Sequence, residues 1–151
     1  MPKTLPLTEP QKLIQSATGA QDELVILVAP TADPGAVGQR LRGRTLATNG
    51  DYICLVPLHG IFTELQVHLT ATFASGSVIS SGPDSLYYVA DFTSLSSATV
   101  KTSGTGDGGL TSTTRQSSSL TGLKGEQYAR VTITIAGGAS AAFTQAEYNG
   151  Y

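Results

Sequence analysis

Residues 61–73 alternate between mainly apolar and mainly polar side chains. Successive side chains of a β-strand point to opposite faces, so this pattern predicts a strand with one buried face and one solvated face. Residues 128–136 repeat the pattern. Each strand must cover its apolar face with another element, which indicates packed sheets. The apolar series consist of Ile61, Leu65, Val67, Leu69, Ala71 and Phe73, and of Ala129, Val131, Ile133 and Ile135.

Two glycine-containing pairs predict tight hairpin turns. Asn49-Gly50 separates residues 40–48 from residues 51–56. Gly137-Gly138 joins the second alternating segment to residues 139–148. A type I′ turn needs positive φ at both central residues, which Asn and Gly adopt most readily. We therefore predict one hairpin at each pair.

The remaining segments with strand character are short. Residues 24–29 and residues 86–92 are rich in β-branched, aliphatic and aromatic side chains and lie next to Pro or Gly signals. Strands separated by turns rather than by helices predict an all-β fold, an antiparallel β-sandwich or barrel that is jelly-roll-like. A chain of 151 residues suits one such domain, which we assign to residues 22–151.

Two segments lack the strand pattern. Residues 1–21 carry three early prolines, which favour extended backbone, and predict an N-terminal arm with a short helix over residues 11–17. Residues 93–123 are almost wholly Ser, Thr and Gly. So little apolar surface predicts either a long loop or strands ordered by a neighbour. Because long loops in compact domains are usually functional or disordered, residues 93–123 are a candidate partner-contacting insertion.

The charge of the chain disfavours several classes of partner. Charged residues make up 13% of the sequence and the net charge is −2 at pH 7, so we expect no nucleic acid and no membrane surface as partner. No apolar run approaches the roughly 20 residues of a membrane span. The single cysteine, Cys54, cannot form an internal disulfide, and residues 1–20 lack a secretory pattern, so we expect synthesis in a cytoplasm.

The sequence predicts no catalytic, cofactor or metal site. Residues 104–109 fit G-x-G-x-x-G, but Ser and Thr flank them instead of a strand and a helix. A hairpin between residues 51–56 and 61–73 would bring Cys54 towards His59 or His68, yet a structural zinc needs four ligands. The carboxylates are scattered and no G-x-S-x-G elbow occurs. We therefore expect a protein that is not an enzyme and that uses no cofactor.

Arg40, Arg42 and Arg44 form the only local concentration of charge. At strand spacing all three would project from one side, with Leu41 and Gly43 on the other. Such a cationic ridge discourages edge-to-edge aggregation. Alternatively, the guanidinium groups clamp carboxylates of a protein partner in a bidentate manner. The acidic balance of the chain favours carboxylate over phosphate as the ligand.

In overall character the chain resembles the small decoration or cement proteins on the capsids of tailed bacteriophages. The resemblance rests on the Ser/Thr/Gly/Ala-rich β domain, the proline-bearing arm and the low-complexity insertion, and it covers composition and layout. It implies a homotrimer at the capsid surface of a virion, made in the host cytoplasm, that stabilises the shell by binding major capsid proteins or another virion protein. We expect the partner to contact the three arginines and the arm residues Pro2, Leu5, Pro6 and Leu7.

Two other classes share these features. A phage tail, baseplate or fibre component would have the same composition and differ only in its location in the particle. A carbohydrate- or protein-binding β-sandwich module would use exposed aromatic rings, with Tyr87 and Tyr88 as the candidate stacking residues.

Overall fold

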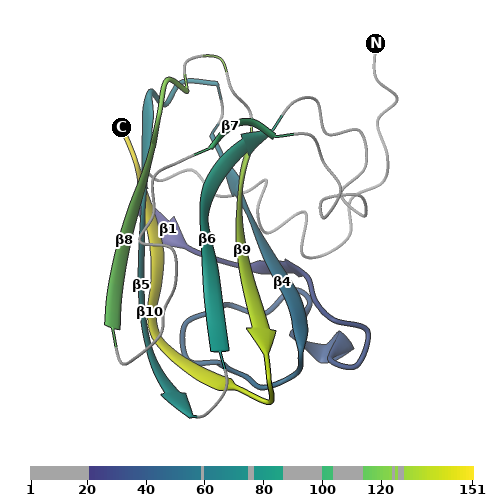
Figure 1. Ribbon diagram of the computed structural model, residues 1–151. Helices are drawn as coiled ribbons and strands as arrows, with labels where there is room; N and C mark the ends of the chain where they lie inside the picture. The colour runs from purple at the N-terminus through teal and green to yellow at the C-terminus, as the bar shows by residue number, and fades with distance from the viewer. Residues whose placement is uncertain are drawn as a thin grey trace.

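The chain forms two antiparallel β-sheets packed face to face (Figure 1). Of the two predicted architectures, sandwich and barrel, the protein adopts the sandwich. No helix among the residues described is long and apolar enough to cross a membrane. The computed structural model describes residues 21–58, 60–74, 77–86, 100–103, 114–123, 125 and 128–151.

One sheet, the β10 sheet, is built around two long strands. β10 (Ser140–Gly150) pairs with β5 (Glu64–Ala74), whose other edge pairs with β8 (Thr114–Thr121). The two short strands β1 (Gln21–Glu23) and β3 (Thr45–Leu46) both pair with β10. In Figure 1 the strands β8, β5 and β10 form one layer of the sandwich.

The other sheet, the β9 sheet, has the order β2-β4-β9-β6-β7 in the described residues. Its centre is β9 (Tyr128–Ala136), which pairs with β4 (Gly50–Pro57) and with β6 (Ser77–Leu86). The outer strands are β2 (Ile26–Val28) and β7 (Val100–Ser103). Figure 1 shows β6, β9 and β4 as the layer opposite the β10 sheet.

The predicted alternation of β5 and β9 is confirmed by burial. The members of the apolar series from Leu65 to Ala71 and from Ala129 to Ile135 lie between the sheets, and burial of each large aliphatic side chain stabilises the fold by about 1.5–3 kcal/mol. β5 begins at Glu64 and not at Ile61, which is 74% exposed. The described core residues of the two strands are Leu65, Val67, Leu69, Ala71, Ala129, Val131, Ile133 and Ile135.

Both predicted hairpin turns lead from one sheet into the other. At Asn49-Gly50 the chain leaves β3, which pairs with β10, and enters β4, which pairs with β2 and β9. The hairpin between residues 40–48 and 51–56 is therefore a wrong prediction. Turn residues determine where the backbone reverses, but each strand pairs where its apolar face is covered.

A turn forms at Gly137-Gly138, but its two strands do not pair as the predicted hairpin. Gly137 and Gly138 have φ values of 65° and 72°, and the Ala139 N–H donates to the Ala136 carbonyl at 3.2 Å. β9 and β10 nevertheless belong to different sheets. The Gly138 N–H also donates to Asn49 Oδ1 at 3.2 Å, so the two chain crossings are joined to each other.

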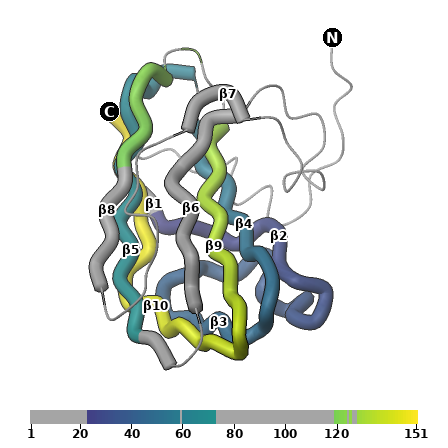
Figure 2. Tube along the Cα trace, in the orientation of Figure 1, coloured from purple at the N-terminus to yellow at the C-terminus, as the bar shows by residue number. Residues whose placement is uncertain are grey.

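The first predicted strand, residues 24–29, is shorter than expected, because β2 covers only Ile26–Val28 and the residues before it cross from one sheet to the other. β1 pairs with β10 and β2 pairs with β4, with Leu24 and Val25 between them. The Leu24 N–H still donates to the Ala146 carbonyl of β10, at 3.0 Å. Figure 2 follows this segment from the β10 sheet to the β9 sheet. Because Leu24 is fully buried, this crossing is part of the core.

Two strands lie within residues 93–123, so the long-loop prediction is wrong for them. β8 pairs with β5 from Glu64↔Thr121 to Ala71↔Thr114, and β7 pairs with β6. The alternative prediction, strands ordered by a neighbour, holds here with neighbours in the same chain. Backbone hydrogen bonds to an existing edge order a strand that has few apolar side chains.

Several predictions fall outside the described residues. These are the arm with its helix over residues 11–17, the G-x-G-x-x-G segment at residues 104–109, and the strand at residues 86–92 beyond Leu86. Of the predicted arm, only Gln21 is described, and it is the first residue of β1.

Candidate functional site

The arginine loop, residues 38–44, lies against both sheets. The Gly38 N–H donates to the Ile26 carbonyl at 2.7 Å, and the Gly43 N–H donates to the Phe143 carbonyl at 2.7 Å. Between them, the Leu41 N–H donates to the Leu24 carbonyl at 3.0 Å. The side chain of Leu41 is fully buried. These contacts with β2, β10 and the crossing between the sheets hold the loop backbone in place.

The loop contains a turn instead of the predicted strand. The Arg44 N–H donates to the Leu41 carbonyl at 3.1 Å, and Gly43 has a φ of +82°, a left-handed conformation that L side chains rarely adopt. This turn ends the strand alternation. The prediction that the three arginines project from one side is therefore wrong.

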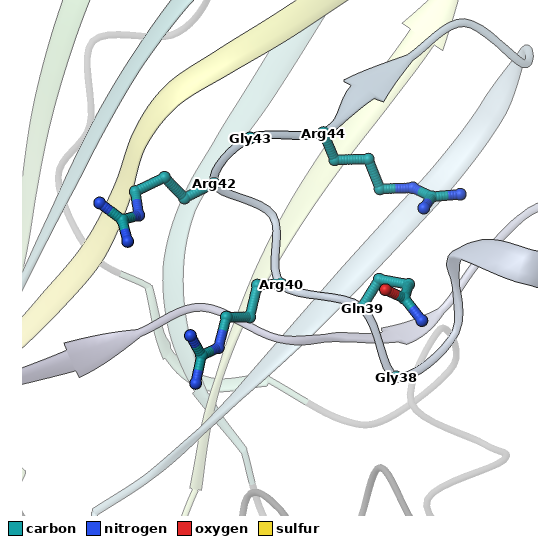
Figure 3. A pocket seen from close by; sticks show the side chains of 6 residues that line it. All are labelled: Gly38, Gln39, Arg40, Arg42, Gly43 and Arg44. Atoms are coloured by element: carbon teal, nitrogen blue, oxygen red, sulfur yellow. The ribbon is translucent and has the colours of Figure 1, made fainter.

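Figure 3 shows the observed arrangement of the side chains. Arg40 and Arg42 extend to one side of the arginine loop, whereas Arg44 and Gln39 extend to the other. The loop therefore presents two different chemical surfaces.

Arg40 and Arg42 share one carboxylate. Arg40 Nη1 lies 3.1 Å from Glu23 Oε2, and Arg42 Nε lies 2.5 Å from Glu23 Oε1. The two arginine side chains remain 64% and 58% exposed. Ion pairs this exposed contribute only about 0–1 kcal/mol to stability. Their main consequence is geometric, because Glu23 holds both guanidinium groups next to β1.

Arg44 belongs to a half-buried network on the other side of the loop. Its Nη2 lies 3.4 Å from Asp33 Oδ1, and the Tyr52 hydroxyl donates to Asp33 Oδ2 at 2.6 Å. Burial, followed by the hydrogen bond to Asp33, raises the pKa of the Tyr52 phenol. Asp33 immediately precedes the short 3₁₀ helix η1 (Pro34–Ala36), so this network joins η1, β4 and the arginine loop.

A cavity of about 420 Å³ opens on the arginine loop. Its walls combine backbone at two glycines with guanidinium and amide groups. The three arginines outnumber the two carboxylates paired with them among the described residues, Glu23 and Asp33, in a chain whose net charge is −2. This composition suits an oxyanion ligand. The lining residues are Gly38, Gln39, Arg40, Arg42, Gly43 and Arg44.

The structure places only part of the predicted partner-binding set. Arg40, Arg42 and Arg44 are brought together in one loop, whereas Pro2, Leu5, Pro6 and Leu7 lie outside the described residues. Glu23 and Asp33, which hold the arginines, were not predicted. Nothing in the local sequence marks these two carboxylates, because their pairing depends on the crossing between the sheets and on η1.

The polar candidates elsewhere are separated by the fold. Cys54 lies on β4 inside the core, whereas His68 lies on the polar face of β5, opposite Glu147. The hairpin expected to bring these residues together does not form, since β4 and β5 belong to different sheets, and His59 is outside the described residues. Within the described ranges, no group of three or more His, Cys, Asp and Glu side chains is arranged to hold a metal ion.

The buried thiol predicts a loss of stability at alkaline pH. Burial raises the pKa of Cys54 to about 12. In the unfolded chain the thiol ionises near pH 8.5, by the approximate reference value. Between these values the unfolded state binds fewer protons than the folded state. The free energy of unfolding from this group should fall with rising pH, by about 1.4 kcal/mol per pH unit.

Urea denaturation at pH 8, 9 and 10 measures this dependence. Cys54→Ala should have a flatter profile between pH 9 and 10, whatever its stability at pH 8. The Tyr52 phenol, whose pKa is also raised, adds its own loss only above about pH 10. Parallel profiles for the two proteins would show that the thiol does not cause the loss.

No protein-family model matches the sequence, and no curated protein matches it. The function is therefore inferred from the sandwich and the arginine loop.

Proposed function

We propose that the protein is a structural component of a virion, a capsid decoration or cement protein that stabilises the shell by binding the major capsid protein. The observation that carries the proposal is the arginine loop, a fixed loop with exposed guanidinium groups in excess of the carboxylates that hold them. Such a loop is suited to docking on a protein surface, because guanidinium groups bind carboxylates through paired, charge-assisted hydrogen bonds.

The outer face of the β10 sheet supports the same proposal. Thr70 Oγ1 donates to Gln145 Oε1 at 2.8 Å, and Gln145 Nε2 donates to Glu147 Oε1 at 2.8 Å. Glu147 is opposite Glu23 of β1, so this face continues to the arginine loop. A sheet face of hydrogen-bonded polar side chains can lie against another protein in a polar, hydrated interface.

The position of β1 determines where the predicted arm joins the domain. Gln21 is opposite Asn149, near the C-terminal end of β10. An extended arm gains affinity from backbone hydrogen bonds to a neighbouring chain. Many equivalent contacts in one lattice reinforce each other, and more so if three copies act together as the proposed homotrimer. We therefore place the stronger part of shell binding in the arm.

Deletion of residues 1–20 tests the proposal. The deletion ends before β1, so the domain should unfold at an unchanged urea midpoint but should no longer sediment with capsid shells. Circular dichroism and co-sedimentation measure the two properties on the same sample. A full-length Leu5→Ser/Leu7→Ser variant should weaken binding in the same way. Shell binding by the truncated protein at wild-type affinity would refute the role of the arm, and a full-length protein that does not sediment with shells would refute the proposed function.

The location of the protein in the particle separates the capsid role from a tail, baseplate or fibre role. A gold-labelled or cryo-imaged virion should carry the protein over the shell surface, and label confined to the tail would assign the tail role. A stable trimer in solution agrees with the capsid role. Glycan-array binding that depends on Tyr87 or Tyr88 would instead indicate the carbohydrate-binding module.

A further inference from the structure

We infer that the exposed side of the arginine loop, formed by Arg40 and Arg42, is a docking site for a carboxylate-bearing segment of the protein partner. The inference rests on the proposed function and adds the chemistry that the partner must present. It also divides the three arginines, since Arg44 has a different role.

The first argument is the number of donors on this side of the loop. Each guanidinium group carries five N–H donors, whereas a carboxylate has two oxygens. Arg40 and Arg42 each reach Glu23 through one nitrogen, and more than half of each side chain is exposed. Two cations therefore share one anion. A second carboxylate would balance the second positive charge and would meet guanidinium groups on largely exposed side chains.

The second argument is that the arrangement exists before binding. The backbone of the loop is hydrogen-bonded to the Leu24, Ile26 and Phe143 carbonyls. Glu23, itself fixed in β1, holds the two guanidinium groups close to each other. Long arginine side chains normally lose rotamer freedom when they bind, and that loss is reduced when they are already held. An exposed and preorganised pair of arginines is better suited to recognition than two mobile ones.

Arg44 acts as a brace for the loop. It extends to the opposite side (Figure 3), where Asp33 pairs with it one to one and the Tyr52 hydroxyl fixes Asp33. Its charge is therefore already matched inside the chain. The docking site consists of Arg40 and Arg42, with Glu23 as the residue that positions them.

Charge favours a carboxylate on a protein over the phosphates of a nucleic acid. The whole chain carries a net charge of −2, so a polyanion is repelled outside the arginine loop. Glu23 shows that a carboxylate fits between these two guanidinium groups. A protein segment that presents one or two acidic side chains gains the local attraction without the wider repulsion.

An NMR titration of the full-length, ¹⁵N-labelled protein tests the inference. The probe is the capped peptide Gly-Glu-Gly-Glu-Gly in low-salt buffer, and the arginine Nε–H signals are followed. The Arg40 and Arg42 signals should shift and saturate, whereas the Arg44 signal should move little. Arg40→Gln/Arg42→Gln should abolish saturable binding. Arg40→Lys/Arg42→Lys should weaken it severalfold, because an ammonium group cannot form the paired contact.

Two controls isolate the chemistry. Lys101→Gln/Lys124→Gln removes the same charge outside the loop and should leave peptide binding unchanged. The capped peptide Gly-Gln-Gly-Gln-Gly should not bind. Saturable binding that persists in Arg40→Gln/Arg42→Gln, that occurs equally with the glutamine peptide, or that is tighter for inorganic phosphate overturns the inference.

The NMR titration tests the docking inference and the shell assay tests the proposed function, so one hypothesis can be refuted without the other. If the peptide does not bind but the full-length protein sediments with shells through its arm, the inference is wrong and the proposed function stands. If the peptide binds through Arg40 and Arg42 but the full-length protein does not sediment with shells, the docking chemistry stands and the capsid role is wrong.

Discussion

Phe143→Ala is expected to lower the free energy of unfolding by about 3–5 kcal/mol, the range for removal of a buried phenylalanine ring. Phe143 is 1% exposed and lies in the core between the sheets. Phe143 belongs to the same buried cluster as Leu41 of the arginine loop and residues of both sheets, so we do not expect movement of one strand to close the cavity. Because domains of this size are stable by only about 5–15 kcal/mol, the variant should be close to unfolding at ambient temperature.

The same substitution should loosen the arginine loop. The Phe143 N–H donates to the Arg44 carbonyl at 3.0 Å, and the Phe143 carbonyl accepts from Gly43. Urea denaturation measures the stability, and amide hydrogen exchange at Gly43 measures the local opening. Thr144→Ala is the matched control, since Thr144 is the next residue and is exposed, and it should change stability by no more than about 0.5 kcal/mol. An equal loss in both variants would show that strand β10, and not the ring, is the sensitive element.

Gly50→Ala is expected to lower the free energy of unfolding by about 3 kcal/mol, from backbone strain and overpacking together. Gly50 has a φ of +130°, a conformation that essentially only glycine adopts. A Cβ atom on this residue would lie 2.8 Å from Pro30 Cγ and 3.0 Å from Pro30 Cβ. The proline ring cannot rotate away as a flexible side chain would, so the main chain must move at the start of β4.

Two other glycines separate these contributions. Gly43 has a φ of +82° and open space where its Cβ would lie, so Gly43→Ala should show backbone strain alone, about 1 kcal/mol. Gly35 has open space and no positive φ, and Gly35→Ala should be nearly neutral. Urea denaturation of the three variants should rank them Gly35, Gly43, Gly50 in order of increasing loss. Equal losses at Gly43 and Gly50 would mean that Pro30 yields to the new methyl group.

The strands with strict alternation were predictable from the sequence, because burial of one face determines the pattern. β9 has the predicted bounds, Tyr128–Ala136, and β5 differs mainly at its start. Which residues of β10 face the core was not predictable from the sequence. A bulge between Phe143 and Gln145 changes which residues face the core, from Ala141 and Phe143 to Ala146 and Tyr148. Such a bulge depends on the neighbouring strands, which here include β3, directly after the arginine loop.

The pairing of strands was harder to predict than the strands themselves. Asn49-Gly50 and Gly137-Gly138 have the local chemistry of hairpin turns, and both connect different sheets. The turn propensity of these residues is satisfied by any reversal of the chain. The pairing of the two flanking strands depends instead on which apolar faces meet. In β4, Ile53 and Leu55 are buried on the face opposite the inter-sheet core. This unbroken apolar run is typical of a strand that is covered on both faces.

The arginines of the candidate site were visible in the sequence because charge is otherwise sparse in this chain. Their arrangement was not, since the turn at Gly43 places Arg44 on the opposite side from its neighbours. The carboxylates that hold them, Glu23 and Asp33, come from β1 and from the residue before η1. The sequence therefore predicted the chemical groups of the site, and the fold determined which of them remain available to a partner.

The crossing of the chain from β1 in one sheet to β2 in the other has a mechanical consequence. Gln21 is opposite Asn149, so a force that pulls Gln21 away from Tyr151 acts at one end of the β1–β10 ladder. The backbone hydrogen bonds between β1 and β10 then break one after another, starting at Gln21. Peeling passes through the three residues of β1 and reaches Leu24, where the chain turns into the other sheet. From that point the tension is shared by both layers of the sandwich, so a tether at the N-terminal side yields over a short distance and is then held firmly.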